Sequence, residues 1–240
     1  MRSYLALVPA VTLFLLSLGS LSLAQGTTPV VSQPSSLVAR LRANLPNRGV
    51  PGSRFGGATR GACVSGSERL TALLPDTHLG QTAVATPTLF VFVPKSKATQ
   101  GEVVIADAEH RPLATMVVDL PAEPGILALK PNVQLQPGQD YRWIFTLLCG
   151  ADADDPSAFI SVSGVISRVQ PATDLAKQLQ GKSGGDRLGA AVDAGLWYET
   201  LAILAELQGN EATRNLARSE WVAVLSAVGL GSIAQAPLVQ

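Results

Sequence analysis

Seven short runs of apolar or alternating residues between positions 70 and 169 constrain the fold more than any other feature of this sequence. They are rich in Val, Ile, Leu and aromatic residues, and turn-forming segments such as Gln136-Pro137-Gly138 separate them. Short strands at this spacing are typical of antiparallel sandwiches and barrels, and the lack of a long helical pattern between them disfavours a parallel α/β sheet. The runs are Leu70–Leu74, Thr88–Val93, Glu102–Asp107, Leu113–Leu120, Ile126–Lys130, Tyr141–Leu148 and Phe159–Val169.

Beyond Pro171 the apolar residues recur at helical spacing. The pattern predicts a short helix over residues 174–180, a long helix from about 187 to 208 with Asp186 as its N-cap, and a last helix from about 211 to 228. Two long helices in succession predict a hairpin that packs on the sheets. We therefore expect a mainly β protein with α: an antiparallel β-sandwich, Ig-like or jelly-roll-like, over residues 63–170, followed by a C-terminal helical hairpin within residues 171–240.

The N-terminus has the order of segments found in a secretory signal peptide. Arg2 supplies the positive charge, Leu5–Leu16 is almost wholly apolar, and Ser22-Leu23-Ala24 has the small-x-small pattern that signal peptidase recognises. We predict cleavage before Gln25 and a periplasmic or secreted mature chain. An uncleaved anchor helix is the alternative, although an apolar core of about a dozen residues is short of the roughly 20 that span a bilayer. No later stretch is long and apolar enough, so we expect no transmembrane anchor after cleavage.

The charge balance narrows the class of partner. The chain has 18 Lys and Arg against 18 Asp and Glu, and removal of residues 1–24 deletes Arg2 but no acid, which leaves 17 against 18. A nearly neutral chain argues against nucleic acid as the main partner. It also argues against a surface that adheres generally to membranes.

Two cysteines, Cys63 and Cys149, remain after the predicted cleavage. In an oxidising compartment such a pair favours one disulfide, which in the chain-entropy model would stabilise the fold by at most about 4–5 kcal/mol. Two buried free thiols or a metal pair are the alternatives. No histidine pattern accompanies the cysteines, which disfavours the metal pair.

Residues 25–62 are predicted to form a flexible basic arm, because they are rich in Gly, Pro, Ser and Thr and show little periodicity. The arm contains no acidic residue. We consider two roles for it: contact with an unknown envelope protein or an anionic polymer, and a solvated linker without a partner. Its Gly-rich end is not a phosphate loop, since the Lys-Ser/Thr pair is absent. The arginines of the possible binding arm are Arg40, Arg42, Arg48, Arg54 and Arg60.

Catalytic signals are weak throughout the chain. His78 and His110 both fall in predicted turns, where a surface histidine is the usual outcome, and no nucleophile-elbow motif marks a serine. Glu199 and Glu206 lie seven residues apart on a predicted helix, so they could share a face for acid–base work, but charges on the solvent face of an amphipathic helix are commoner and this interpretation is favoured. The acidic cluster Asp152-Ala153-Asp154-Asp155 favours a solvated turn over a calcium site. We predict no catalytic, cofactor-binding or metal site and no cofactor.

Several segments carry a family resemblance when they are taken in order. The chain resembles the domain of unknown function family 928, which consists mostly of exported cyanobacterial proteins. The resemblance covers about residues 51–237 and implies an envelope location and one shared fold, but no activity. Glu199 stands where the resemblance leads us to expect Asp, a change that keeps the carboxylate. The segments are Gly56–Gly61 with Cys63, Leu70–Pro75, Phe90–Pro94, Tyr141-Arg142-Trp143 with Cys149, Gly164–Val169 and Gly195–Glu199.

These observations favour an exported cell-envelope protein of unknown activity that acts as a non-catalytic binding or assembly module. A hydrolase acting on an envelope polymer is the alternative from a different class, with Glu199, Asp152 or Asp155 as the candidate acids. A deep polar cleft that gathers two carboxylates would support it. A purely structural envelope component is the third alternative.

Overall fold

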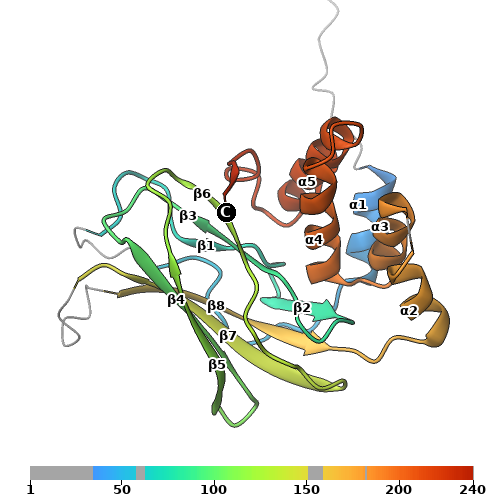
Figure 1. The fold of residues 1–240 in the computed structure, drawn as a ribbon, viewed down its shortest axis with the longest axis horizontal. Helices are drawn as coiled ribbons and strands as arrows, with labels where there is room; N and C mark the ends of the chain where they lie inside the picture. The colour runs from blue at the N-terminus through green and yellow to red at the C-terminus, as the bar shows by residue number, and fades with distance from the viewer. Residues whose placement is uncertain (1–34, 58–62, 151–158, 182, 240) are drawn as a thin grey trace, which may run out of the picture. The chain divides into compact units, whose positions relative to one another are not determined.

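The computed structural model describes residues 35–57, 63–150, 159–181 and 183–239. They form two β-sheets and five helices, and the helices gather at one end of the sheets (Figure 1). The strands are β1 (Thr71–Ala72), β2 (Leu79–Thr82), β3 (Leu89–Val93), β4 (Gln100–Ala106), β5 (Pro112–Asp119), β6 (Gly125–Leu129), β7 (Gln139–Leu148), β8 (Phe159–Arg168) and β9 (Leu238–Val239). The helices are α1 (Ser36–Asn44), α2 (Thr173–Leu179), α3 (Gly184–Asp193), α4 (Trp197–Gln208) and α5 (Arg214–Ala227).

The larger sheet has the strand order β2-β8-β7-β4-β5. Strands β7 and β8 pair antiparallel over their full length, and β4 joins β7 to β5 in the same sense. Strand β2 is the exception, because it pairs parallel to β8 with Leu79 opposite Val165. The smaller sheet has the order β1-β3-β6-β9, with β9 parallel to β6. The sheets are therefore dominated by antiparallel pairs, as predicted, but each carries one parallel edge strand.

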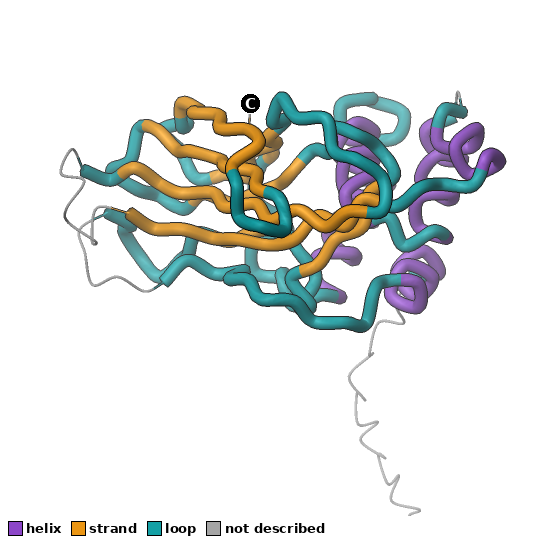
Figure 2. Tube along the Cα trace, turned by 90° about the horizontal axis from the view of Figure 1, so that it is seen from below, coloured by secondary structure: helices purple, strands orange, loops and turns teal. Residues whose placement is uncertain are grey.

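The inner faces of both sheets contribute to one hydrophobic core, and the two sheets lie as neighbouring layers in Figure 2. Strand β7 buries every second side chain, which places Tyr141, Trp143 and Phe145 in this core. The alternation of the run Tyr141–Leu148 predicts this shared aromatic face, because successive side chains of a strand point to opposite sides. Strand β3 is buried along its whole length, because one face meets the other sheet and the other lies beneath the helices.

The predicted long helix over 187–208 is wrong as a single element. The chain forms α3 and α4 instead, and it turns between them at Gly195, whose φ is +65°. The backbone carbonyl of Asn44 in α1 occupies the space that a Cβ at Gly195 would need. A residue with a side chain would be strained here for both reasons, so glycine is required at this turn.

The expected C-terminal hairpin is not confirmed, and neither is an Ig-like or jelly-roll arrangement. The structure is a mixed α/β fold with two sheets, and no barrel closes among the described residues. Four helices follow β8, and α1 packs against α3 and α5. Helix α1 lies within the segment that was predicted to be a flexible arm. Its N-cap is Ser35, whose hydroxyl accepts a hydrogen bond from the backbone N–H of Val38.

Cys63 and Cys149 form a disulfide, as predicted, and their Cα atoms are 5.4 Å apart. The bond joins the segment before β1 to the end of β7. The predicted signal peptide, residues 1–24, lies outside the described residues. Within the part of the chain that the structure describes, no helix combines the length and the apolar character needed to cross a membrane.

Candidate functional site

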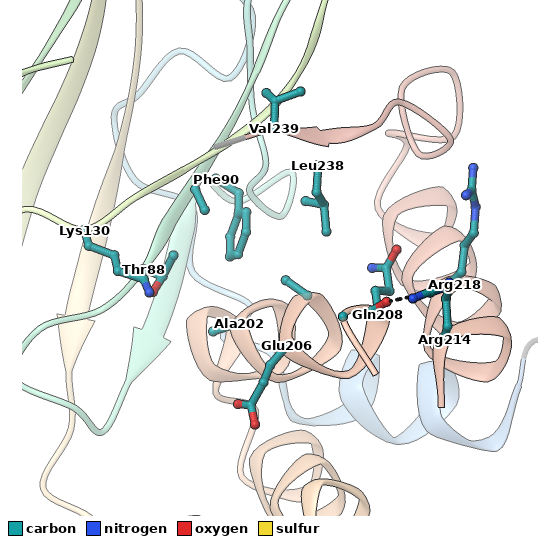
Figure 3. Close-up of a pocket in the computed structure, with 13 residues that line it drawn as sticks. Thr88, Phe90, Lys130, Ala202, Glu206, Gln208, Arg214, Arg218, Leu238 and Val239 are labelled. Atoms are coloured by element: carbon teal, nitrogen blue, oxygen red, sulfur yellow. Dashed lines mark hydrogen bonds between the residues drawn. The ribbon is translucent and has the colours of Figure 1, made fainter. Parts of the chain in front are cut away.

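A groove of about 680 Å³ lies between the smaller sheet and the helices α4 and α5 (Figure 3). One wall comes from β3, the end of β6 and β9, and the opposite wall from α4 and the first turns of α5. The chain segments that form it are far apart in the sequence, so the groove exists only in the folded protein. Its lining residues are Thr88, Phe90, Ala128, Lys130, Ala202, Ala205, Glu206, Gln208, Gly209, Arg214, Arg218, Leu238 and Val239.

Apolar side chains from both walls make the floor of the groove. Phe90 lies at its centre between Ala202 and Leu238 (Figure 3). The ring of Phe90 is held by an edge-on contact with Trp221 of α5, with 5.5 Å between the ring centroids. Because Trp221 is buried and fixes this ring, the floor has a defined shape before any ligand binds.

Three cationic side chains stand on the rim. Lys130 follows β6, and Arg214 and Arg218 lie across the groove on α5 (Figure 3). Arg214 Nε donates to the backbone carbonyl of Gln208 at 3.2 Å, which fixes the position of this side chain. The rim is therefore positive above an apolar floor.

The one acidic side chain among the lining residues is already paired. Glu206 points away from Phe90 and Leu238 (Figure 3), and its Oε1 accepts from Arg187 Nη2 at 2.6 Å. This ion pair leaves the positive charge of Lys130, Arg214 and Arg218 without compensation from the described lining.

A second cavity of about 190 Å³ continues the groove along α4. It shares Thr88, Ala202 and Glu206 with the larger groove and ends at Glu199. Only 7 % of Glu199 is exposed. Its Oε1 accepts from three donors: Thr82 Oγ1 at 3.0 Å, the backbone N–H of Ala83 at 2.6 Å and that of Val84 at 3.1 Å.

The other carboxylate oxygen of Glu199, Oε2, is buried and has no hydrogen-bond partner among the described residues. Burial raises the pKa of Glu199 above its ordinary value, although the donors on Oε1 oppose this shift. The sequence interpretation that favoured a solvent-facing Glu199 is therefore wrong. The side chain holds the loop after β2 against the start of α4.

The two residues before Glu199 anchor α4 to the sheets, Trp197 to the segment after β1 of the smaller sheet and Tyr198 to the larger sheet. Trp197 Nε1 donates to the carbonyl of Leu73 at 2.9 Å. The hydroxyl of Tyr198 accepts from Trp143 Nε1 at 3.0 Å and donates to the carbonyl of Val165 at 3.2 Å. Burial raises the pKa of Tyr198, so the phenol is neutral and is a positioning group rather than a base.

The arginines of the predicted arm mostly make contacts within the chain. Arg40 pairs with Asp193 at 3.1 Å and Arg48 pairs with Asp140 at 2.6 Å. Arg42 lies exposed in the last turn of α1, and Arg60 lies outside the described residues. None of the described arm arginines lines the groove.

Arg54 is buried, which the interpretation as an arm residue did not anticipate. Its Nη1 donates to the carbonyl of Leu74 at 3.1 Å and to that of Val228 at 2.8 Å, at the end of α5. Burial lowers the pKa of Arg54, while the charge of Asp76 opposes this shift. Arg54 thus ties the segment before β1 to both a strand end and a helix end.

The two histidines do not line the groove or the second cavity. His78 and His110 both lie in turns and adopt positive φ angles of 61° and 65°. His78 is half-buried, with Nδ1 at 3.2 Å from the carbonyl of Val50, and His110 is exposed. The acidic cluster at 152–155 lies outside the described residues. Elsewhere in the described chain, no three His, Cys, Asp or Glu side chains gather as they would around a metal ion.

Comparison with known proteins gives a family but no activity. No curated protein matches the chain. The family model that matches covers residues 55–238, well over half of the sequence, which includes both sheets, α2 to α5 and the groove. The chain therefore belongs to the family described as Domain of Unknown Function (DUF928).

Proposed function

We propose that this protein is an exported, non-catalytic binding module of the cell envelope, and that the groove beside α4 binds an anion with an apolar group. One observation carries the proposal: three cations stand above an apolar floor, and the only acid in the lining is paired with Arg187. The two sheets support a sandwich-type scaffold, and the helices complete the groove.

The chemistry of the lining narrows the ligand class. A volume of about 680 Å³ falls in the range of sites for small molecules, roughly 300–1,000 Å³. Leu238 and the alanines of α4, which are partly exposed, would gain from contact with a short acyl or alkyl chain, and Phe90, which is 2 % exposed, supports them from below. Lys130, Arg214 and Arg218 would hold its anionic head, because charge-assisted hydrogen bonds to carboxylate or phosphate are strong.

A set of matched ligands tests the proposal. Decanoate carries both the chain and the charge, decyl maltoside carries the chain alone, and acetate carries the charge alone. Isothermal titration calorimetry of the mature chain below the micelle concentrations should show saturable binding of decanoate, with the other two at least about tenfold weaker. Equal affinity for decanoate and decyl maltoside would show that the cations of the groove do not contribute to binding.

Variants locate the site. Arg218→Gln and Lys130→Gln should each weaken decanoate binding by about five- to tenfold, because each removes one charged partner. Lys95→Gln is the control, since Lys95 is an exposed cation outside the groove lining. A loss of affinity in Lys95→Gln as large as that in Arg218→Gln would show that only the overall charge matters.

The hydrolase alternative has one observation in its favour, because Glu199 and Glu206 both line the second cavity. Against it, Glu199 Oε1 is occupied by three structural hydrogen bonds and Glu206 is paired with Arg187. If this alternative is correct, the mature chain releases fragments from purified envelope polymer, and Glu199→Gln abolishes the release without lowering decanoate affinity. If our proposal is correct, no fragments appear with either protein.

Export is the remaining part of the proposal, and the predicted signal peptide supports it. N-terminal sequencing of the protein from an envelope fraction should begin at Gln25. A chain in that fraction that begins at Met1 would favour the uncleaved anchor instead.

A further inference from the structure

Strand β5 presents a free edge of the larger sheet. It lies at the end of the order β2-β8-β7-β4-β5, and among the described residues it pairs only with β4. Natural proteins protect such edges with lysines, prolines, bulges or covering segments. Residues 113–118 contain no charge and no proline. Pro112 begins the strand, and the register shifts by one residue at Leu113, because Ile105 and Ala106 pair with Ala114 and Pro112.

The backbone of β5 has hydrogen-bonding groups available at this edge. The N–H of Leu120 donates to the carbonyl of Thr99 at 2.8 Å, in the same register that pairs Asp119 with Gln100. In an antiparallel pair the residues that bond across the ladder alternate. Ala114, Met116 and Val118 therefore point their N–H and C=O groups toward β4, and Thr115, Val117 and Asp119 point theirs toward the free edge.

The same residues expose their side chains. Leu113 is 48 % exposed and Val117 is 53 % exposed, which makes them two of the few large apolar residues on the described surface. Thr115 and Asp119 are also exposed, whereas the even-numbered side chains are half-buried against the core. Free backbone groups and apolar side chains thus coincide along one strand.

We infer that β5 pairs antiparallel with β5 of a second copy of this chain, which joins two five-stranded sheets into one. If the two Thr115 residues face each other at the centre of the pair, Leu113 of one copy lies opposite Val117 of the other. Arg111 of one copy then lies near Asp119 of the other. A shift of the register by one step, centred on Met116, would place Leu113 opposite Asp119 instead. The strand is therefore self-complementary in apolar contact in one register, as a two-fold interface requires, while Arg111 keeps its ion pairs with Asp107 and Glu109 of its own chain.

The first test measures the mass of the mature chain in solution. Light scattering between about 1 and 100 µM should show a monomer–dimer equilibrium, and Val117→Lys should weaken it by about tenfold or more, because it places two lysines within the apolar part of the interface. Leu216→Lys is the matched control, since Leu216 is an exposed apolar residue on α5, 69 % exposed. A wild-type chain that stays monomeric over this range would overturn the inference, as would equal weakening by Leu216→Lys.

The second test reads the register directly. At the centre of the pair, the two Thr115 Cα atoms should lie about 5.5 Å apart, within the range of about 4.4–6.8 Å that a disulfide bridges. Thr115→Cys should therefore form a covalent dimer on mild oxidation. Val117→Cys should not, because its two copies are offset by about 13 Å along the strand. Equal cross-linking of the two variants, or none with Thr115→Cys, would contradict the proposed pairing.

Discussion

Replacing Glu199 with alanine should destabilise the fold far more than replacing it with glutamine. The alanine variant leaves Thr82 Oγ1 and the N–H groups of Ala83 and Val84 without their acceptor. The glutamine variant keeps a carbonyl oxygen in the position of Oε1, so the three donors retain their partner. The comparison therefore separates the hydrogen-bonding role of this residue from its charge.

The size of the effect follows from the number of donors that are stranded. A buried donor without a partner costs about 1–3 kcal/mol. The N–H of Val84 is also within 3.2 Å of Thr82 Oγ1, so it keeps a partner and two donors are lost in full. We expect Glu199→Ala to lower the free energy of unfolding by about 3–5 kcal/mol, which is a Tm lower by roughly 10 °C for a chain of this size.

Thermal unfolding as a function of pH adds a second, independent expectation. Because the pKa of Glu199 is raised in the folded protein, the neutral form is the one that the fold favours. The contribution of the neutral Glu199 carboxyl to the free energy of unfolding is present in full below the unfolded-state pKa. It is lost as pH rises through the folded-state pKa. Wild type and Glu199→Gln should therefore differ least at about pH 4, and the glutamine variant should gain in relative stability as pH increases.

Two results would refute this reasoning. One is a Glu199→Ala variant as stable as Glu199→Gln at every pH, which would mean that the three hydrogen bonds contribute nothing net. The other is a stability difference between wild type and Glu199→Gln that does not change with pH, which would mean that the folded-state pKa is ordinary. Glu206→Gln is the control, because this carboxylate is exposed on the same helix.

Three further changes test other parts of the fold. Replacing both Cys63 and Cys149 with serine should lower stability by at most about 4–5 kcal/mol, measured by denaturant unfolding, and the wild type should unfold like the variant once it is reduced. Trp143→Phe and Tyr198→Phe should each lower the free energy of unfolding by about 1–3 kcal/mol. In a double-mutant cycle the two losses should not add, because each substitution removes the same hydrogen bond of 3.0 Å between Trp143 and Tyr198. Gly195→Ala should cost about 2–4 kcal/mol in thermal unfolding, since it combines a positive φ with a clash against Asn44, whereas Gly189→Ala in α3, where nothing obstructs a Cβ, should be neutral or stabilising.

The features that the sequence predicted correctly are those with a local periodic signal. The alternation along β7 placed Tyr141, Trp143 and Phe145 on the core face, because successive side chains of a strand point to opposite sides. The disulfide followed from the presence of two cysteines in a chain with a predicted signal peptide. Neither inference needed knowledge of which strands are neighbours.

The features that were missed depend on contacts between distant segments. Strand β2 has only four residues, and it is a strand because β8 pairs with it 86 positions later, Leu79 with Val165. The predicted helix over 187–208 runs through Gly195, but its positive φ and the nearby carbonyl of Asn44, which belongs to a distant segment, make this position a turn. Glu199 is buried because the loop after β2 offers it three donors, and helical spacing alone carries no information about that loop.

The groove could not be predicted for the same reason. The sequence pattern does not distinguish Phe90 from other strand residues. It also does not distinguish the groove cations Lys130, Arg214 and Arg218 from other charged surface residues. Strand β9, which supplies Leu238 and Val239, has only two residues and pairs parallel with β6. The site is assembled from side chains without a common motif, so only the fold brings them together.

The three consecutive residues at the start of α4 also bear on the order of folding. Each of these residues forms a hydrogen bond to a distant part of the sequence. The partner of Trp197 is 124 positions away, that of Tyr198 is 55 positions away and that of Glu199 is 117 positions away. The bonds of Tyr198 and Glu199 can form only after β2, β7 and β8 have come together, and the bond of Trp197 only after the segment that follows β1 is in place, because loop closure precedes the contacts that reward it. Helix α4 should therefore dock late, with low φ-values for Trp197 and Glu199. Backbone amides in its first turns should exchange with solvent only when the larger sheet opens.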